Sequence, residues 1–153
     1  MSHGKLIFYF FIRKSHYFLN LPCFFLSVNV EMSPAREYLE DEIFSKFNEY
    51  AAMQTTRVTI DWFMGYGDKR IYSEEQSYRF LKEEVAIRLA HMISQLQYLP
   101  VPIRDNVKTQ WTIEKYCQSF REVLEFKDKN PNPAVMRDFM ACLTTFKDRH
   151  KVT

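Results

Sequence analysis

The sequence predicts an all-α fold, an antiparallel helical bundle. Two observations lead to this prediction. After Met32, apolar residues recur at steps of three and four along most of the chain, and no segment alternates with a period of two over a convincing length. The segments are joined by short connections, so neighbouring long helices are expected to run antiparallel. With 153 residues and 46% apolar content, the chain is large enough for one domain with a buried core.

Residues 1–31 form an atypical leader that is aromatic and basic. The first thirty residues carry Lys5, Arg13 and Lys14 but no acidic residue, and they also contain apolar runs at 7–12 and 18–28. The runs are too short for a membrane span, and the basic pair interrupts a secretory signal. Two interpretations stay open: a mitochondrial targeting segment, or a stretch without an evolved role that comes from an incorrect gene model.

The remaining chain, residues 32–153, is predicted to be the bundle domain. Ser33 supplies a capping hydroxyl and Pro34 suits the first helical position, so a helix is expected from there to about Met53. The apolar residues of this helix recur at helical spacing: Tyr38, Leu39, Ile43, Phe44, Phe47 and Tyr50.

A short helix is expected after a break. Residues 55–58 form the break, Thr59 caps a helix over residues 60–64, and residues 65–67, Gly-Tyr-Gly, close it.

The strongest predicted helix begins at Ser73, where Gln76 completes a capping box. Pro100 and Pro102 end it, since proline disfavours the helical conformation in the residue before it. Its apolar stripe consists of Tyr78, Leu81, Val85, Leu89, Met92, Ile93 and Leu96.

Two more helices are expected, capped by Asn106 and by Asn132 with Pro133. The inward residues of the first are Val107, Trp111, Tyr116, Phe120, Val123 and Leu124, and those of the second are Met136, Phe139, Leu143, Phe146 and His150. The last stripe is still running where the sequence stops, so the bundle is expected to be incomplete.

Composition excludes several kinds of site. Only three glycines are present, and Gly65 and Gly67 have neither the third glycine nor the Gly-Lys pair of a phosphate-binding loop. A net charge of +2 is too small to indicate nucleic-acid binding. Cys23, Cys117 and Cys142 are odd in number and far apart, which argues against disulfides and a zinc site.

Five motifs, in order, resemble those of the mitochondrial α-ketoacid dehydrogenase kinases. Residues 80–90, Phe-Leu-Lys-Glu-Glu-Val-Ala-Ile-Arg-Leu-Ala, resemble F-L-R-x-E-L-P-V-R-L-A. Residues 98–100 match L-L-P, residues 111–126 are similar to W-Y-x-Q-S-x-x-x-x-x-E-F, and residues 63–67 resemble F-L-D-F-G. Residues 149–150, Arg-His, stand where the family has R-H-N-D. The Tyr-x-Gln-Ser stretch favours the pyruvate dehydrogenase kinase branch.

The resemblance implies the N-terminal helical domain of a protein-serine kinase of the mitochondrial matrix. The family phosphorylates the decarboxylase component of the pyruvate dehydrogenase complex with ATP and Mg²⁺. These cofactors are bound by a C-terminal domain, which the sequence does not match, so this chain is expected to hold no cofactor or metal and to be inactive alone. His150 corresponds to a histidine that supports catalysis by orienting a glutamate of that domain.

The resemblance also implies a regulatory pocket for pyruvate-like carboxylates. The corresponding residues are Leu89, Tyr116, Ser119, Lys147 and His150. Lys147 stands where the family has an arginine, and a point charge replaces a planar fork there. Ordinary core packing is the alternative for Leu89 and Tyr116.

A second implied site is an apolar pocket for the lipoyl-lysine arm of the acyltransferase. Val58, Phe63, Tyr66 and Phe80 correspond to its walls, and an aromatic core is the alternative. The expected partners are therefore a lipoyl domain and, in a dimer, a full kinase subunit; neither nucleic acid nor a membrane is expected.

Other hypotheses stay open. The chain could derive from a branched-chain α-ketoacid dehydrogenase kinase. It could be a non-catalytic decoy or adaptor that occupies lipoyl domains, or an incorrect gene model with no stable product.

Overall fold

The computed structural model of the protein describes residues 33–57 and 73–151. Within these ranges the chain is helical and contains no strand, which confirms the all-α prediction. The helices are α2 (Ala35–Tyr38), α3 (Asp41–Ala52), α5 (Glu74–Gln97), α6 (Val101–Arg104), α7 (Val107–Leu124) and α8 (Pro133–Arg149). The leader at 1–31 and the short helix expected at 60–64 lie outside the described residues.

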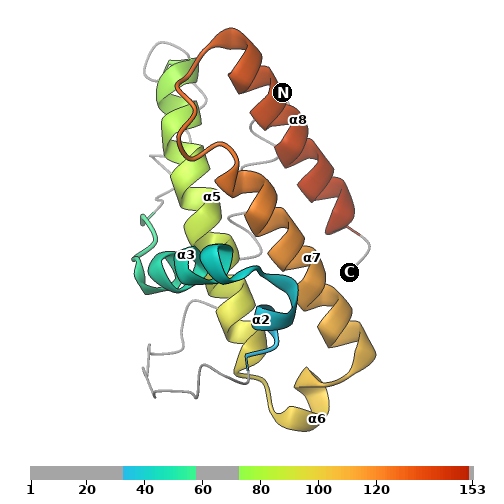
Figure 1. The fold of residues 1–153 in the computed structure, drawn as a ribbon. Helices are drawn as coiled ribbons and strands as arrows, with labels where there is room; N and C mark the ends of the chain where they lie inside the picture. The colour runs from blue at the N-terminus through green and yellow to red at the C-terminus, as the bar shows by residue number, and fades with distance from the viewer. Residues whose placement is uncertain (1–32, 58–72, 152–153) are drawn as a thin grey trace.

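The three long helices α5, α7 and α8 run in alternating directions (Figure 1). α5 packs against α7, and α8 lies beside α7 on the other side. α3 crosses α5, and the short α2 packs on α7. The antiparallel arrangement that the short connections predicted is therefore confirmed for this part of the chain.

The predicted starts of the long helices are confirmed by their capping bonds. The amide of Gln76 donates to the Ser73 hydroxyl (3.1 Å), and the Ser73 amide donates to the Gln76 side chain (2.9 Å). Asn106 accepts from the Lys108 amide at 2.9 Å. Asn132 accepts from two amides of the first turn of α8, at 3.0 and 2.9 Å. These side chains satisfy backbone donors that have no partner inside the helix.

The helix predicted from Ser33 to Met53 is wrong as a single element. The backbone is extended at Leu39 (φ −120°, ψ 128°), which separates α2 from α3. Leu39 is buried at this break. The interruption of the helix lets α2 pack on α7 while α3 crosses α5. The expected cap is also absent, because the hydroxyl of Ser33 has no hydrogen-bond partner among the described residues.

The first turn of α7 was predicted to face the core, but it is exposed. Val107 is 82% exposed and Trp111 is 42% exposed. α5 ends at Gln97, as the prolines predicted, but the chain then forms the unpredicted α6, in whose first turn Pro102 lies. Proline is tolerated there because its missing N–H has no helical acceptor. The first turn of α7 packs against the short α6 at the end of the bundle and not against the core. The first buried residue of α7 is therefore Ile113.

Aromatic side chains join the helices of the core. Phe120 is fully buried and meets Phe47 and Tyr50 edge to face, with centroids 6.1 and 5.9 Å apart. Phe139 makes similar contacts with Tyr78 and Phe126, both at 5.2 Å. Such pairs contribute about 0.5–1.5 kcal/mol beyond the burial of their area. The core therefore fixes α3 and α8 on the α5–α7 pair.

Candidate functional site

Four polar residues are buried in the described part of the chain: Glu84, Arg88, Ser119 and His150. A buried polar group is costly unless it is hydrogen-bonded, so each one marks a constraint on the structure. They form two separate networks. One joins α7 to α8 around Ser119, and the other ties residues 53–57 to α5.

The first network converges on the hydroxyl of Ser119, which has no exposed surface. Arg149 donates from Nη1 to this hydroxyl oxygen at 2.7 Å. The Nε2 atom of His150 lies 3.0 Å from the same oxygen. Since Ser119 belongs to α7 and the other two residues belong to the end of α8, this one hydroxyl joins the two helices.

The hydrogen bond from Arg149 determines the direction of the hydrogen bond between the Ser119 hydroxyl and His150. The hydroxyl oxygen already accepts from the guanidinium, and its own hydrogen needs an acceptor within the protein because Ser119 is fully buried. Nε2 of His150 lies within hydrogen-bond distance, at 3.0 Å. We therefore assign the neutral His150 tautomer that carries its proton on Nδ1, since a proton on Nε2 would leave the buried Ser119 hydrogen unpaired.

The guanidinium of Arg149 is held in a fixed orientation by Glu122. Nη2 donates to the two carboxylate oxygens at 2.8 and 3.0 Å. Gln118 donates to the same carboxylate at 3.0 Å. Arg149 is only 14% exposed in its side chain, so this ion pair is better shielded from solvent than a surface pair. Its planar fork reaches Ser119 and Glu122 at once, which a lysine could not do.

Aromatic and apolar side chains line the same region. The ring of Tyr116 stacks on that of His150, with centroids 4.4 Å apart and planes at 21°. Burial raises the pKa of the Tyr116 hydroxyl, so it stays protonated at neutral pH. Leu89 of α5 is 1% exposed in the same core. The cation of Arg149 lies over Phe146 at 5.5 Å.

The structure brings together three of the five predicted pocket residues and places Arg149 and Glu122 beside them. Tyr116, Ser119 and His150 are in contact, as described above. Lys147 is half-buried on α8, and none of these contacts involves it. Sequence reasoning missed Arg149 and Glu122. A signal was present for Glu122, because it follows Ser119 by three residues and so lies on the same face of α7. Spacing gave no such signal for Arg149, since adjacent helical residues point in different directions.

The second network was not expected from the sequence. Glu84 and Arg88 form an ion pair with N···O distances of 2.7 and 2.8 Å, both side chains being at most 8% exposed. The backbone amide of Thr56 donates to both Glu84 oxygens at 3.2 Å, and Arg88 donates to the Thr56 carbonyl at 3.1 Å. His91 adds a hydrogen bond to the carbonyl of Met53 (2.9 Å). Residues 53–57 are thus fastened to α5.

Of the predicted lipoyl-binding residues, only Phe80 is described. It is half-buried on α5, one turn before Glu84. Val58, Phe63 and Tyr66 lie outside the described residues. The prediction of this pocket therefore stays a prediction.

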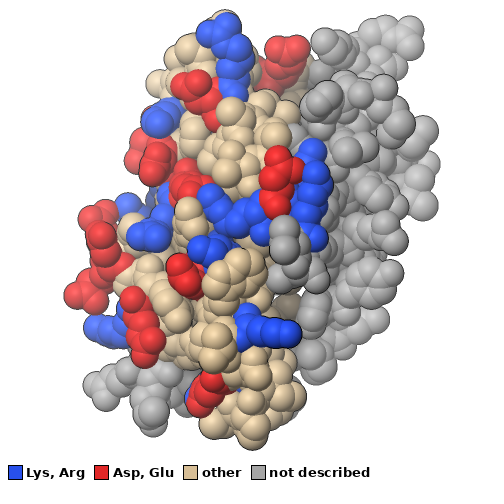
Figure 2. All heavy atoms as spheres, turned by 90° about the vertical axis from the view of Figure 1, so that its right-hand side faces the viewer, with Lys and Arg blue, Asp and Glu red and all other residues tan. Residues whose placement is uncertain are grey.

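The two described cysteines, Cys117 and Cys142, are structural residues. Burial raises the pKa of the Cys117 and Cys142 thiols to about 12, which makes them unreactive at neutral pH. In the described ranges, no group of three His, Cys, Asp or Glu side chains could hold a metal ion. No helix of that part is long and apolar enough for a membrane span. Basic and acidic side chains are interspersed over the described part of one face (Figure 2).

Comparisons with known proteins give a consistent family. The family model described as mitochondrial branched-chain alpha-ketoacid dehydrogenase kinase matches residues 57–153, well over half of the chain. The human mitochondrial pyruvate dehydrogenase (acetyl-transferring) kinase isozyme 3 is 28% identical over 116 residues, covering 75% of this chain and 28% of that protein. The mitochondrial pyruvate dehydrogenase kinase of Ascaris suum is 28% identical over 105 residues, covering 69% and 26%.

The probable pyruvate dehydrogenase kinase of Caenorhabditis elegans is 29% identical over 105 residues, with 69% and 26% covered. The chain thus spans about a quarter of the length of these relatives. No solved structure matches the chain significantly.

The Glu84–Arg88 pair yields a prediction about stability. The substitution Arg88→Met leaves the Glu84 carboxylate buried without its cation, so it should lower the free energy of unfolding by about 3–5 kcal/mol. Urea denaturation followed by circular dichroism measures this. The matched control is Arg79→Met, which removes an exposed partner of Glu75 on the same helix and should cost less than about 1 kcal/mol.

A double variant tests the cause. Adding Glu84→Gln removes the unpaired charge and should restore part of the loss. If Arg88→Met is no more damaging than Arg79→Met, the pair does not hold residues 53–57 on α5.

Proposed function

The chain belongs to the family of mitochondrial α-ketoacid dehydrogenase kinases, and we propose that it serves as a helical regulatory domain that binds a small carboxylate beside Ser119. The observation that carries this proposal is the buried contact between Arg149 and the Ser119 hydroxyl at 2.7 Å. A guanidinium that is held in place by Ser119 and Glu122 is a charged donor that suits a carboxylate. On this proposal Arg149 supplies the charge, because Lys147 makes none of these contacts.

The surroundings suit a small ligand of the pyruvate type. Arg149 has five N–H groups, and its bonds to Ser119 and Glu122 leave others for a ligand oxygen. The Tyr116 ring, which stacks on His150, would contact the apolar part of the molecule. Because Glu122 already balances the guanidinium, an incoming carboxylate would compete with it. We therefore expect weak binding that depends on ligand concentration.

A role in kinase activity is also proposed from family membership, since the relatives are named mitochondrial pyruvate dehydrogenase kinases. On this proposal, the protein acts in the mitochondrial matrix and regulates the pyruvate dehydrogenase complex. ATP and Mg²⁺ would be bound by a separate nucleotide-binding domain, and His150 would support catalysis by orienting a glutamate there. The description of the matching family model keeps a branched-chain substrate as the alternative.

A second candidate function is binding of a lipoyl domain. The observation that favours it is the attachment of Thr56 to Glu84, which lies one turn after Phe80 on the same helix. Val58, Phe63 and Tyr66 follow Thr56 in the sequence. A chain that binds lipoyl domains without catalysis would act as a decoy or adaptor, or pair with a full kinase subunit.

Calorimetry with pyruvate tests the carboxylate site. Ser119→Ala removes the anchor of Arg149, so the Kd for pyruvate should rise about tenfold. Ser45→Ala, an exposed serine of α3, is the matched control and should leave the Kd unchanged. Equal binding by both variants would refute the site. Circular dichroism is used to check that each variant remains folded.

Binding of an isolated lipoylated domain tests the second candidate. Phe80→Ala should weaken the complex about tenfold, because aromatic contacts dominate such interfaces. Tyr98→Ala replaces an exposed aromatic residue at the other end of α5 and serves as the control. The idea fails if the lipoylated domain and its unlipoylated form bind equally well to the unmodified chain.

A further inference from the structure

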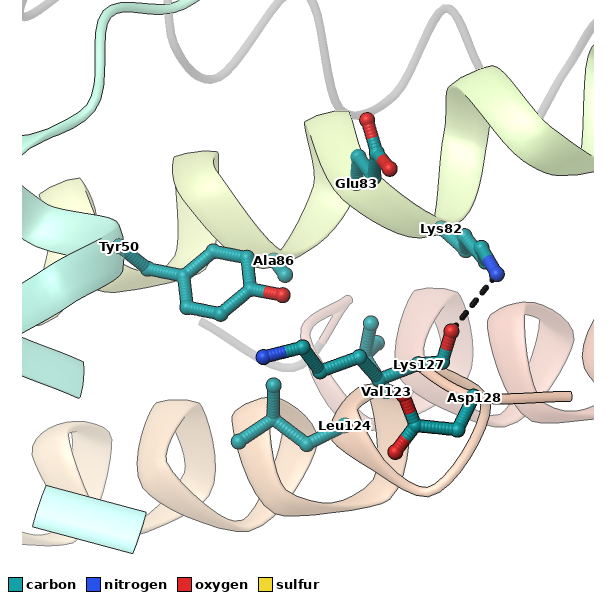
Figure 3. Close-up of a pocket in the computed structure, with 8 residues that line it drawn as sticks. All are labelled: Tyr50, Lys82, Glu83, Ala86, Val123, Leu124, Lys127 and Asp128. Atoms are coloured by element: carbon teal, nitrogen blue, oxygen red, sulfur yellow. Dashed lines mark hydrogen bonds between the residues drawn. The ribbon is translucent and has the colours of Figure 1, made fainter. Parts of the chain in front are cut away.

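A small hollow opens between α3, α5 and the end of α7, away from Ser119 and His150 (Figure 3). Its volume is about 150 Å³. A cavity of this size holds a molecule as large as benzene. The residues that line it are Tyr50, Lys82, Glu83, Ala86, Val123, Leu124, Lys127 and Asp128.

The hydroxyl of Tyr50 is the first sign that this hollow is built for a ligand. Tyr50 is only 6% exposed, and its ring points from α3 into the hollow. No other described residue hydrogen-bonds to its hydroxyl, whereas Tyr38 and Tyr78 both have partners. A largely buried hydroxyl usually finds a partner. The free donor therefore faces the space that a ligand would fill.

Four charged side chains stand around the same hollow. Lys82 donates to the Lys127 carbonyl at 2.7 Å, and the ammonium of Lys127 lies over the Tyr50 ring at 5.7 Å. Glu83 lies on the α5 side and Asp128 on the α7 side (Figure 3). None of these four side chains forms an ion pair with a described residue, so both signs remain available.

The charge balance selects the ligand class. Two carboxylates would repel a simple anion, and two ammonium groups would repel a simple cation. The floor is apolar, since it consists of Ala86, Val123 and Leu124. We propose that the hollow binds a small zwitterion with one carboxylate, one ammonium group and a short aliphatic part, the chemistry of an aliphatic α-amino acid.

Each part of such a ligand has its partner. Its carboxylate accepts from the Tyr50 hydroxyl and from the ammonium of Lys127. Its ammonium group pairs with Asp128, which follows Lys127 directly, and its aliphatic part rests on Leu124 and Val123. Burial and the negative charges of Glu49, Glu83 and Asp128 raise the pKa of Tyr50, so its hydroxyl remains a donor at neutral pH.

Titration of the full chain with L-leucine, followed by NMR, tests the site. A ligand of this size should bind with a Kd of about a millimolar. Tyr50→Phe deletes only the hydroxyl and should raise the Kd about tenfold. Tyr38→Phe is the matched control, because it makes the same change where the hydroxyl contacts Gln110 (3.4 Å), and it should leave the Kd unchanged.

Two single-charge probes test the ligand class. 4-Methylpentanoate lacks the ammonium group of leucine, and 3-methylbutylamine lacks the carboxylate; both should bind at least tenfold more weakly. Asp128→Asn should weaken leucine binding without weakening that of 4-methylpentanoate. Absence of leucine binding, an unchanged Kd in Tyr50→Phe, or equal binding of 4-methylpentanoate would each overturn the proposal.

Discussion

A single buried hydroxyl, that of Ser119, sets how α7 and α8 meet. It accepts from Arg149 and contacts His150, and it has no access to water. Both partners lie at the end of α8, so a small rotation of that helix would leave a buried polar group unpaired at a cost of about 1–3 kcal/mol. Aromatic contacts such as that of Phe139 with Tyr78 attach α8 to α5. The hydroxyl supplies the register.

The polar networks share one physical feature, which is a charged group held on a rigid helix by partners of fixed geometry. Glu122 orients Arg149 toward Ser119, and Glu84 with Arg88 holds the backbone of Thr56. Such preorganisation favours binding, because less side-chain conformational entropy is lost when a ligand or partner binds. The candidate carboxylate site and the candidate lipoyl site thus depend on ion pairs that are largely shielded from water.

The sequence predicted the three long helices well, because their caps and stripes are local signals. Ser73 with Gln76, Asn106 and Asn132 all cap as expected. The break at Leu39 and the exposed Val107 depend on which helix packs where, and periodicity carries no such information. Likewise, the contact of Arg149 with Ser119 depends on the rotation of α8 about its axis, which spacing along one helix does not define.

The protonation of His150 tests the central claim most directly. Nitrogen-15 NMR of the imidazole ring distinguishes its two tautomers in the full chain at neutral pH. If Ser119 joins α7 to α8 as described, Nδ1 carries the proton and Nε2 shows the shift of an unprotonated acceptor. In Ser119→Ala this preference should disappear. A protonated Nε2 in the unmodified chain, or a tautomer that ignores Ser119, would contradict the account.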